Sequence, residues 1–314
     1  MKRCVLIAIS LLFVVGLITA VFAGVRKRVQ PVVKLGFNKL DFPEHGVHLI
    51  IPTDTGFDDT ARKHFKYRSP EDLKPFSVFI HNSGPRKVMA YALTWKLVRK
   101  DGQVITKTVG YSEPDLFMGK EEVKAPGYKH TVAIEPDNAR CFTLESKIDP
   151  DLDDVPPANA ASHVSVFAVK GSAVDLQNDA ARLKEQLAAQ LTELSDITVS
   201  LDGVVFDDGI FIGSNQIFFQ QLQATINAKV DLLQELAKGV EEHKTDQALA
   251  SIEAASQEPE VTFSREFSAD EYYRFYRKLY AGEIIGMTRT FGKIRALPHF
   301  LNWHHADRPI LRKG

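Results

Sequence analysis

The main change in the spacing of apolar residues along the chain occurs near residue 213. Before that point, every second residue of one run is large and apolar, namely Met89, Tyr91, Leu93, Trp95 and Leu97. After it, apolar residues recur every three or four positions, namely Phe219, Leu222, Ile226, Val230, Leu233, Ala237 and Val240. Period two is typical of strands and period 3.6 of amphipathic helices. The sequence therefore predicts an α+β fold, with strands in residues 32–213 and helices in residues 214–314.

Turn residues divide the strand-rich part into short runs. Asn82-Ser83-Gly84-Pro85 ends one run, and Asp101-Gly102 and Asp208-Gly209 are typical of two-residue hairpins with positive φ. Strands are expected at residues 76–80, 88–98, 104–109, 128–134, 141–144, 164–169 and 197–213. Many short strands with one apolar face predict an antiparallel β-sandwich. An interior Trp95 favours an immunoglobulin-like or fibronectin-like topology, although the paired cysteines of immunoglobulin domains are absent.

Several helices are predicted from apolar stripes and end signals. One is inserted in the sandwich at residues 175–194, where it would cover an open face or edge of a sheet. A long helix over residues 214–243 would extend roughly 45 Å at 1.5 Å per residue. The acidic stretch up to residue 257 is either a second helical piece or a tether. Ser268 and Glu271 form a capping box that opens aromatic helices over residues 268–296, the last ending before Pro298.

Residues 1–23 form a basic start followed by an apolar run, with only Ser10 and Thr19 as polar interruptions. Small residues at the end of the run are typical of a signal-peptidase site. The run of about 20 residues is also long enough to span a bilayer, and the basic residues 26–28 resist translocation. The segment is therefore predicted to be a signal peptide or an N-terminal membrane anchor. The body is expected outside the cytoplasm, periplasmic, secreted or membrane-anchored, with an inverted topology as an alternative.

Charge and motif content disfavour several classes of function. The chain has 39 Lys plus Arg and 40 Asp plus Glu, so no overall positive field attracts nucleic acid. Cys4 lies in the apolar run, and Cys141 is interpreted as a small core residue. Dinucleotide, phosphate-loop and zinc-peptidase motifs are absent, so no cofactor is predicted.

Asp54-Thr55-Gly56 matches the tripeptide that presents the catalytic carboxylate of aspartic peptidases. Its context differs, because a bulky Phe57 follows the glycine and the supporting Ile-Ile-Gly element occurs only at residues 284–286, in a helical region. The same tripeptide is also ordinary turn chemistry. Asp54 is thus a weak candidate for catalysis, with a turn as the alternative.

Two further groups of side chains could bind a metal. His299, His304, His305 and Asp307 are close in sequence and offer imidazole and carboxylate ligands for Zn²⁺. The spacing of known zinc sites is missing, and a tail with exposed histidines explains the same residues. The run Asp202-Gly203 and Asp207-Asp208-Gly209 suggests a Ca²⁺ loop, but it lacks the closing Glu of an EF-hand, so turns are favoured.

The segment after residue 262 interleaves aromatic with basic residues, namely Phe263, Arg265, Phe267, Tyr272, Tyr273, Arg274, Phe275, Tyr276, Arg277, Lys278, Tyr280, Arg289, Lys293 and Arg295. Such side chains suit stacking on bases, sugars or a partner's rings, or contact with lipid headgroups. The favoured alternative is an aromatic stripe that docks on the sandwich, with the basic residues on its solvated face.

Residues 197–213, ITVSLDGVVFDDGIFIG, lead directly into the long helix. This strand, hairpin and helix start resembles a recurring segment of uncharacterised exported proteins from soil bacteria. The resemblance implies a reused structural unit and no particular activity.

The leading functional hypothesis is a non-enzymatic exported module that binds or assembles with an unknown protein or another cell-envelope partner. It depends on the targeting segment, the sandwich pattern and the missing catalytic signatures. One alternative is an extracytoplasmic hydrolase that resembles an aspartic peptidase at Asp54. Another is a membrane-anchored scaffold that self-associates through the apolar seam of the long helix.

Overall fold

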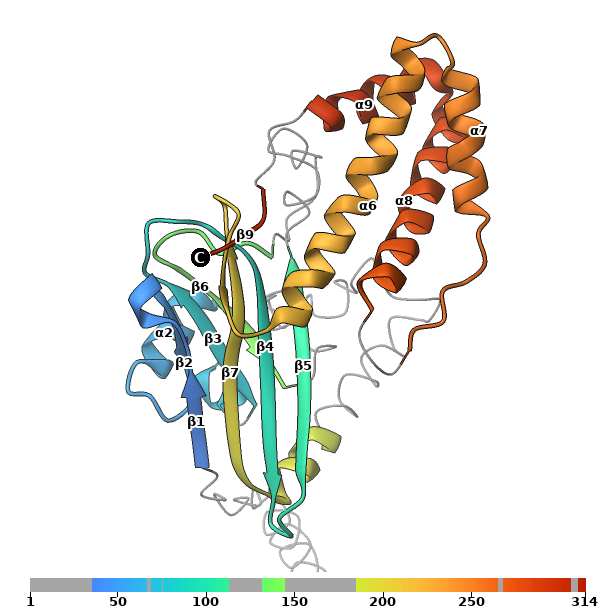
Figure 1. Cartoon of the computed structure of the whole chain (residues 1–314). Helices are drawn as coiled ribbons and strands as arrows, with labels where there is room; N and C mark the ends of the chain where they lie inside the picture. Colours follow the sequence, from blue (N-terminus) through green and yellow to red (C-terminus); the bar gives the residue numbers. More distant parts are fainter. Residues whose placement is uncertain are drawn as a thin grey trace, which may run out of the picture. The chain divides into compact units, whose positions relative to one another are not determined.

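A computed structural model describes residues 36–66, 69–74, 76–112, 132–144, 185–264, 268–305 and 310–314. Its elements in chain order are β1 (Gly36–Leu40), η1 (Pro43–His45), β2 (Val47–Ile50), α2 (Phe57–His64), α3 (Pro70–Leu73), β3 (Ser77–Asn82), β4 (Val88–Arg99), β5 (Val104–Ser112), β6 (Asn138–Thr143), β7 (Leu194–Phe206), β8 (Ile210–Gly213), α6 (Gln216–Glu241), α7 (Thr245–Ser256), α8 (Ala269–Phe291), α9 (Lys293–His305) and β9 (Arg312–Lys313). The fold is α+β, as predicted (Figure 1).

The larger sheet is organised around the long strand β7. One side of β7 pairs with β4, which in turn pairs with β5, and both pairings are antiparallel. The other side pairs first with β1 and then, near its end, with β8. The interior position of β4 buries Trp95, which is 1% exposed. A β-bulge between Val88 and Ala90 moves Met89 into the cluster that faces α6, so Met89 does not share the face predicted for it.

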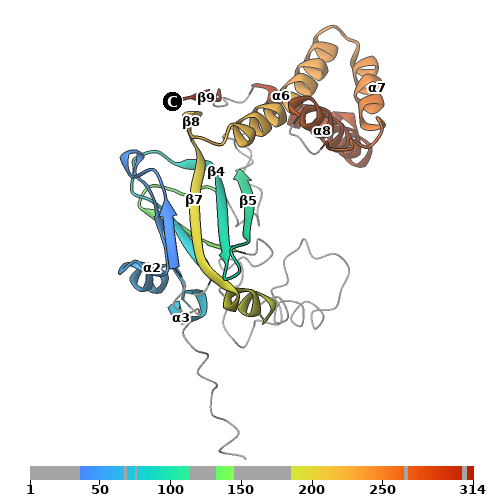
Figure 2. The same cartoon turned by 60° about the horizontal axis from the view of Figure 1, so that its bottom comes forward.

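Two pairings in this sheet are parallel, which the antiparallel prediction did not include. β1 runs parallel to β7, and β9 runs parallel to β8. Parallel neighbours require a long crossover connection, and both pairs have one. The crossover between β8 and β9 contains α6, α7, α8 and α9. The region predicted to be helical over residues 214–314 therefore returns to the sheet in its last residues (Figures 1 and 2).

The smaller sheet has the order β2-β3-β6. Its central strand β3 is buried on both faces, whereas the sequence suggested one buried face. The reason is α2, which was not predicted and which places Phe57 and Ala61 against Phe79 and Cys141. Cys141 is buried in the core, as predicted. The other face meets the larger sheet, where the ring centroids of Phe142 on β6 and Tyr91 on β4 are 5.1 Å apart.

Both predicted hairpins form, but their turns differ from the predicted type. Gly102 and Gly209 have positive φ of 87° and 80°, and the preceding Asp101 and Asp208 do not. Each loop is longer than two residues, because β5 begins at Val104 and β8 at Ile210. A single glycine in the left-handed region is enough for these wider loops.

Helix α6 begins on a patch of the larger sheet that has almost no side chains. Gly110, Ala92 and Gly203 are directly paired neighbours on β5, β4 and β7. A Cβ atom added to Gly203 would lie 2.7 Å from the ring of Phe211 and 3.3 Å from that of Phe218. Asn215 caps the helix by accepting a hydrogen bond from the Phe218 backbone N–H at 2.9 Å. The cap and the small residues together hold Phe218 on the sheet.

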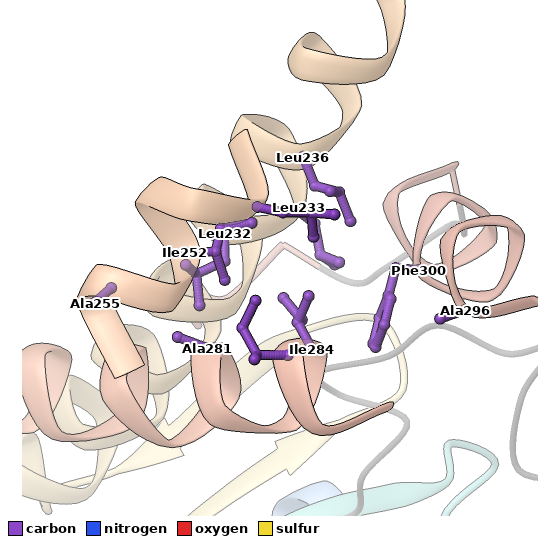
Figure 3. Close-up of a cluster of buried hydrophobic side chains, with 11 residues drawn as sticks. Leu232, Leu233, Leu236, Ile252, Ala255, Ala281, Ile284, Ala296 and Phe300 are labelled. Atoms are coloured by element: carbon purple, nitrogen blue, oxygen red, sulfur yellow. The ribbon is translucent and has the colours of Figure 1, made fainter. Parts of the chain in front are cut away.

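The remainder of α6 packs with α7, α8 and α9 around a second apolar core (Figure 3). This core contains Leu232, Leu233, Leu236, Leu249, Ile252, Ala255, Ala281, Ile284, Ile285, Ala296 and Phe300. The acidic stretch that sequence left as a helix or a tether is the helix α7. It approaches α6 at Gly239, where an added Cβ would lie 2.4 Å from the Cβ of Ala248.

The helix boundaries in the aromatic segment differ from the prediction. One continuous helix, α8, replaces the two expected helices and runs through Gly282 and Gly286. It ends at Gly292, whose φ is 75°. Pro298 lies inside α9 and does not end it. The Ile294 carbonyl oxygen lacks its usual intrahelical donor, because Pro298 has no N–H. Both residues lie on the exposed side of α9, so water can donate to that oxygen instead.

Several predicted segments fall outside the described residues: the targeting segment 1–23, the strand at 164–169, most of the strand at 128–134, and residues 175–184 of the inserted helix. Residues 185–192 of that helix are described and are helical. Within the described ranges, none of the helices has the length and apolarity needed to cross a bilayer.

The patch beneath Phe218 leads to a matched pair of substitutions. Gly203→Ala should lower the free energy of unfolding by about 1–3 kcal/mol, because the new methyl group overpacks two rings. Gly282→Ala in α8, where an added Cβ meets nothing within 4 Å, should raise it by about 0.5–1 kcal/mol. Urea titrations of both variants measure these changes. If the free energy of unfolding changed in the same direction in both variants, the packing described would be contradicted.

Candidate functional site

A buried lysine lies where α6, α8 and α9 pack together. Lys229 is only 2% exposed, although lysine is rarely found fully buried in proteins. Its ammonium group lies 4.9 Å from the centroid of the Tyr280 ring, within the range of a cation–π interaction. The aromatic ring therefore provides part of the environment that water would otherwise supply.

Local sequence explains why these side chains meet. Lys229 follows Thr225 by four residues and precedes Leu233 by four, so it occupies a position in the buried stripe of α6. On α8, the predicted capping box forms in part: the Ser268 side chain accepts a hydrogen bond from the Glu271 N–H. The Glu271 carboxylate accepts bonds from Ser264 instead of from Ser268. This cap fixes the start of the helix that carries Tyr280.

Three tyrosines of α8 form a row on the face beside Lys229. The ring centroids of Tyr272 and Tyr276 are 6.4 Å apart, and those of Tyr276 and Tyr280 are 6.0 Å apart. Burial raises the pKa of Tyr280, and nearby Tyr276 and Glu283 raise it further. Burial also raises the pKa of Tyr276, against a hydrogen bond with Thr225 that lowers it. Both phenols are therefore neutral at physiological pH.

His299 of α9 belongs to the same group of side chains. Burial lowers its pKa, the charge of Glu283 opposes that change, and the charge of Lys229 adds to it. The imidazole is therefore mostly neutral at pH 7. We refer to Lys229, Tyr280, Glu283 and His299 as the Lys229 cluster. It combines a buried ammonium, a neutral phenol and a neutral imidazole with one carboxylate at its edge.

The Lys229 cluster bears directly on the predicted metal ligands. His299, His304 and His305 all lie on α9, and Asp307 lies outside the described residues. An ammonium group close to His299 repels a metal cation and attracts an anion. Among the residues that the structure describes, no three His, Cys, Asp or Glu side chains are arranged to hold a metal ion. Asp307 and the side chain of His305 lie outside the described residues, so the metal site stays a prediction.

Four basic residues of the aromatic segment are paired with carboxylates, three of them on a neighbouring helix. These pairs are Arg277 with Glu235, Lys278 with Glu260, Arg289 with Glu253, and Lys293 with Asp246. In addition, the Tyr273 hydroxyl donates to the Asp231 carboxylate at 2.7 Å. The segment therefore packs against other helices through paired side chains, whereas the favoured alternative expected it to dock on the sandwich. Arg265 and Phe267 lie outside the described residues.

Asp54 lies in the turn between β2 and α2. Its carboxylate accepts hydrogen bonds from the Lys39 ammonium at 2.7 Å and from the Ile51 N–H at 3.1 Å. The same ammonium also donates to the Leu49 carbonyl oxygen at 2.7 Å. The carboxylate thus fastens this turn to β1. This is the turn chemistry that sequence offered as the alternative to catalysis.

The aspartates considered for calcium lie in and beside the β7–β8 hairpin. Asp208 accepts a hydrogen bond from the Ile210 N–H at 3.0 Å and pairs with Arg86 at 3.3 Å. Asp202 lies within β7, where burial raises the pKa of its carboxyl group and a hydrogen bond from Thr94 lowers it. Asp207 and Asp208 thus lie in a turn as predicted, whereas Asp202 and Gly203 are strand residues of β7 and the turn interpretation is wrong for them.

Sequence reasoning missed two arrangements of ionisable side chains. It did not single out Lys229, although a lysine within an apolar helical stripe was the available signal. It named His81 but did not pair it with His48, although the two are direct neighbours on β2 and β3 with ring centroids 6.4 Å apart. His48 contacts the Ser83 hydroxyl at 3.0 Å, and that hydroxyl also donates to the Gly46 carbonyl oxygen. Cross-strand pairing of this kind depends on register, which sequence alone does not fix.

Comparisons with protein-family models, with curated proteins and with solved structures give no match. The resemblance of residues 197–213 to exported bacterial proteins therefore stays a prediction. The observed geometry of that segment is a strand, a hairpin and the start of α6.

The Lys229 cluster predicts opposite changes in the pKa of His299. Lys229→Met removes a positive charge and should raise the pKa of His299, whereas Glu283→Gln removes a negative charge and should lower it further. Proton NMR titration of the His299 ring measures both. Because replacing a buried charge by an apolar side chain is often neutral or stabilising, Lys229→Met should not lower the melting temperature. Shifts of the same sign in the two variants would rule out the cluster as described.

Proposed function

We propose that this chain is a non-enzymatic extracytoplasmic binding or assembly module. Residues 1–23 would export it and either anchor it in the membrane or be removed. In this proposal the two sheets pack as a sandwich of the immunoglobulin or fibronectin kind and serve as the scaffold. The contact between Tyr91 and Phe142 across the two sheets supports that arrangement. The helices between β8 and β9 then carry the binding surface.

The observation that carries this proposal is the way the helical region is joined to the sheet. Its first turns pack on the larger sheet through Phe218 and Phe219, and the chain after its last helix pairs with β8 through β9. Within it, acidic and basic side chains are paired across helices. A unit that is fixed at both ends and satisfied internally suits the rigid presentation of a surface to a partner.

Large apolar side chains on this unit are exposed and available to a partner. Leu279 and Phe291 of α8 are each 54% exposed, and Ile294 of α9 is 91% exposed. Phe291 and Ile294 flank the turn between α8 and α9, at Gly292. Aromatic and aliphatic anchors of this kind dominate the energetics of protein interfaces. We propose that this turn contacts a cell-envelope protein.

No specific contact favours the two alternative functions. The peptidase hypothesis requires an available carboxylate at Asp54, whereas that group is bonded to Lys39 and Ile51. Self-association through the long helix requires an open apolar seam. In α6 that seam contributes Leu232, Leu233 and Leu236 to the core shared with α7, α8 and α9.

The proposed location can be tested separately from the folded body. Residues 1–35 fused to alkaline phosphatase, which is active only outside the cytoplasm, should give active enzyme in a bacterial host. Leu11→Arg combined with Val14→Arg should abolish the activity, because charges in the apolar run oppose insertion. An inactive wild-type fusion that accumulates in the cytosol would remove extracytoplasmic function from consideration.

The proposed contact surface can be tested by photocrosslinking in intact cells. A photoreactive amino acid in place of Ile294 should give a discrete crosslinked product. The same amino acid in place of Val104, which is 51% exposed on β5, should not. Products of equal yield from the two positions, or none from position 294, would contradict a partner at the α8–α9 turn.

A further inference from the structure

Two histidines lie opposite each other on the smaller sheet, on the face that α2 covers in part. His48 of β2 and His81 of β3 are directly paired residues of two antiparallel strands. Side chains two residues apart in a strand share a face, so the pair lies on the same side as Ile50 and Phe79, which pack in the cluster formed with α2. Phe79 is buried there, whereas both histidines are partly exposed. The two rings can therefore be reached from solvent.

The distance between the two imidazoles suits a shared metal ion. Their ring centroids are 6.4 Å apart, and their ring planes differ by 28°. Two imidazoles that bind one tetrahedral metal through bonds of about 2.0–2.1 Å have ring centroids roughly 5 Å apart. Directly opposite residues of a sheet have Cβ atoms only about 4.5–5.5 Å apart. A small rotation of the side chains thus brings both rings within bonding distance of one ion.

The hydrogen bonds of Ser83 determine which nitrogen of His48 is available. The Ser83 hydroxyl donates its proton to the Gly46 carbonyl oxygen at 3.1 Å. Towards His48 Nε2, at 3.0 Å, the hydroxyl oxygen is therefore the acceptor, so Nε2 carries the hydrogen of the neutral ring and Nδ1 keeps its lone pair. Histidines that bind metals typically have such a partner on their other nitrogen, because it fixes the tautomer and the ring orientation.

The charges around the pair permit a cation to bind. Burial lowers the pKa of His81 and the charge of His48 lowers it further, whereas the Asp137 carboxylate raises it and Lys63 of α2 lowers it. The effect of Asp137 is larger than that of Lys63, so the charge of the carboxylate outweighs that of the ammonium group at the ring. The lowered pKa leaves the His81 ring mostly neutral at pH 7, which is the form that binds metals.

We propose that His48 and His81 together bind one late first-row divalent cation, with Cu²⁺ held most tightly. Imidazole nitrogen suits Cu²⁺, Ni²⁺ and Zn²⁺, and the affinity of a given set of ligands is greatest for Cu²⁺. Two protein ligands leave the ion open to water, unlike a group of three, which the described part of the chain does not contain. The ion would link β2 to β3. The inference is independent of the partner proposed at the α8–α9 turn and of the location of the protein.

Calorimetric titration with Cu²⁺ near neutral pH tests the site in the full chain in detergent micelles. The chain carries Cys4→Ser, so that this thiol neither binds nor reduces the ion. His48→Asn and His81→Asn should each remove one equivalent of bound Cu²⁺, or weaken its binding by at least about tenfold, since even the loss of a second-shell partner costs that much. Any binding by the C-terminal histidines contributes equally to all these chains and cancels in the comparison.

The matched control is His243→Asn. His243 is exposed between α6 and α7 and has a φ of 57°, a conformation that asparagine tolerates, so this variant should bind Cu²⁺ as the parent chain does. Unchanged stoichiometry and affinity in His48→Asn and His81→Asn would overturn the proposal. A loss of the same size in His243→Asn would also overturn it.

A second measurement needs no substitution at the pair. Cu²⁺ is paramagnetic and broadens the NMR signals of the rings that bind it. Substoichiometric Cu²⁺ should broaden the ring-proton signals of His48 and His81 together, and before that of His243. Broadening of only one signal of the pair, or of both only after His243, would contradict a shared ion.

Discussion

The contact between the first turns of α6 and the larger sheet determines how the two parts of this fold are joined. Phe218 and Phe219 of α6 are each more than nine-tenths buried in this contact. The small residues Ala92 of β4 and Gly203 of β7 leave room there for the rings. An aromatic side chain buries about 150–250 Å², and at roughly 25 cal/mol per Å² the two rings contribute on the order of several kcal/mol. Gly213, with φ of 126°, turns the chain from β8 into the capping residue Asn215. The direction of α6 is thus set within a few residues of the sheet.

Lys229 has a different role, because burial of an ammonium group opposes folding. The effective cost is several kcal/mol, and one cation–π contact returns only about 1–2 kcal/mol of it. A chain selected for stability alone would place an aliphatic residue in the stripe of α6. The lysine instead restricts how α6, α8 and α9 can pack, since a shifted helix would move the ammonium group away from the Tyr280 ring. A defined register between helices is what a fixed binding surface requires, so the cluster and the proposed function are physically consistent.

The features that sequence predicted well are local ones. The period-two run became β4, the three-four spacing became α6, and the box at Ser268 caps α8. The features it missed depend on partners distant in sequence. The face of Met89 was reversed by a bulge, α2 was hidden because its apolar residues contact β3, and Pro298 was tolerated because its side of α9 is exposed. At the candidate site, His299 was identified from composition, but its neighbours Lys229 and Glu283 lie on other helices. Spacing along the chain carries no information about such a meeting.

The interhelical ion pairs decide which part of the helical region remains available for recognition. Each is partly exposed and contributes only about 0–1 kcal/mol to stability, so the apolar core in Figure 3 provides most of what holds these helices together. Their larger effect is on binding, because a basic side chain already paired with a carboxylate attracts an external anion weakly. With Arg277, Arg289 and Lys293 paired in this way, the exposed apolar side chains Leu279, Phe291 and Ile294 remain available on α8 and α9. The proposal of a protein partner, in place of a nucleic acid, depends on this loss of free positive charge.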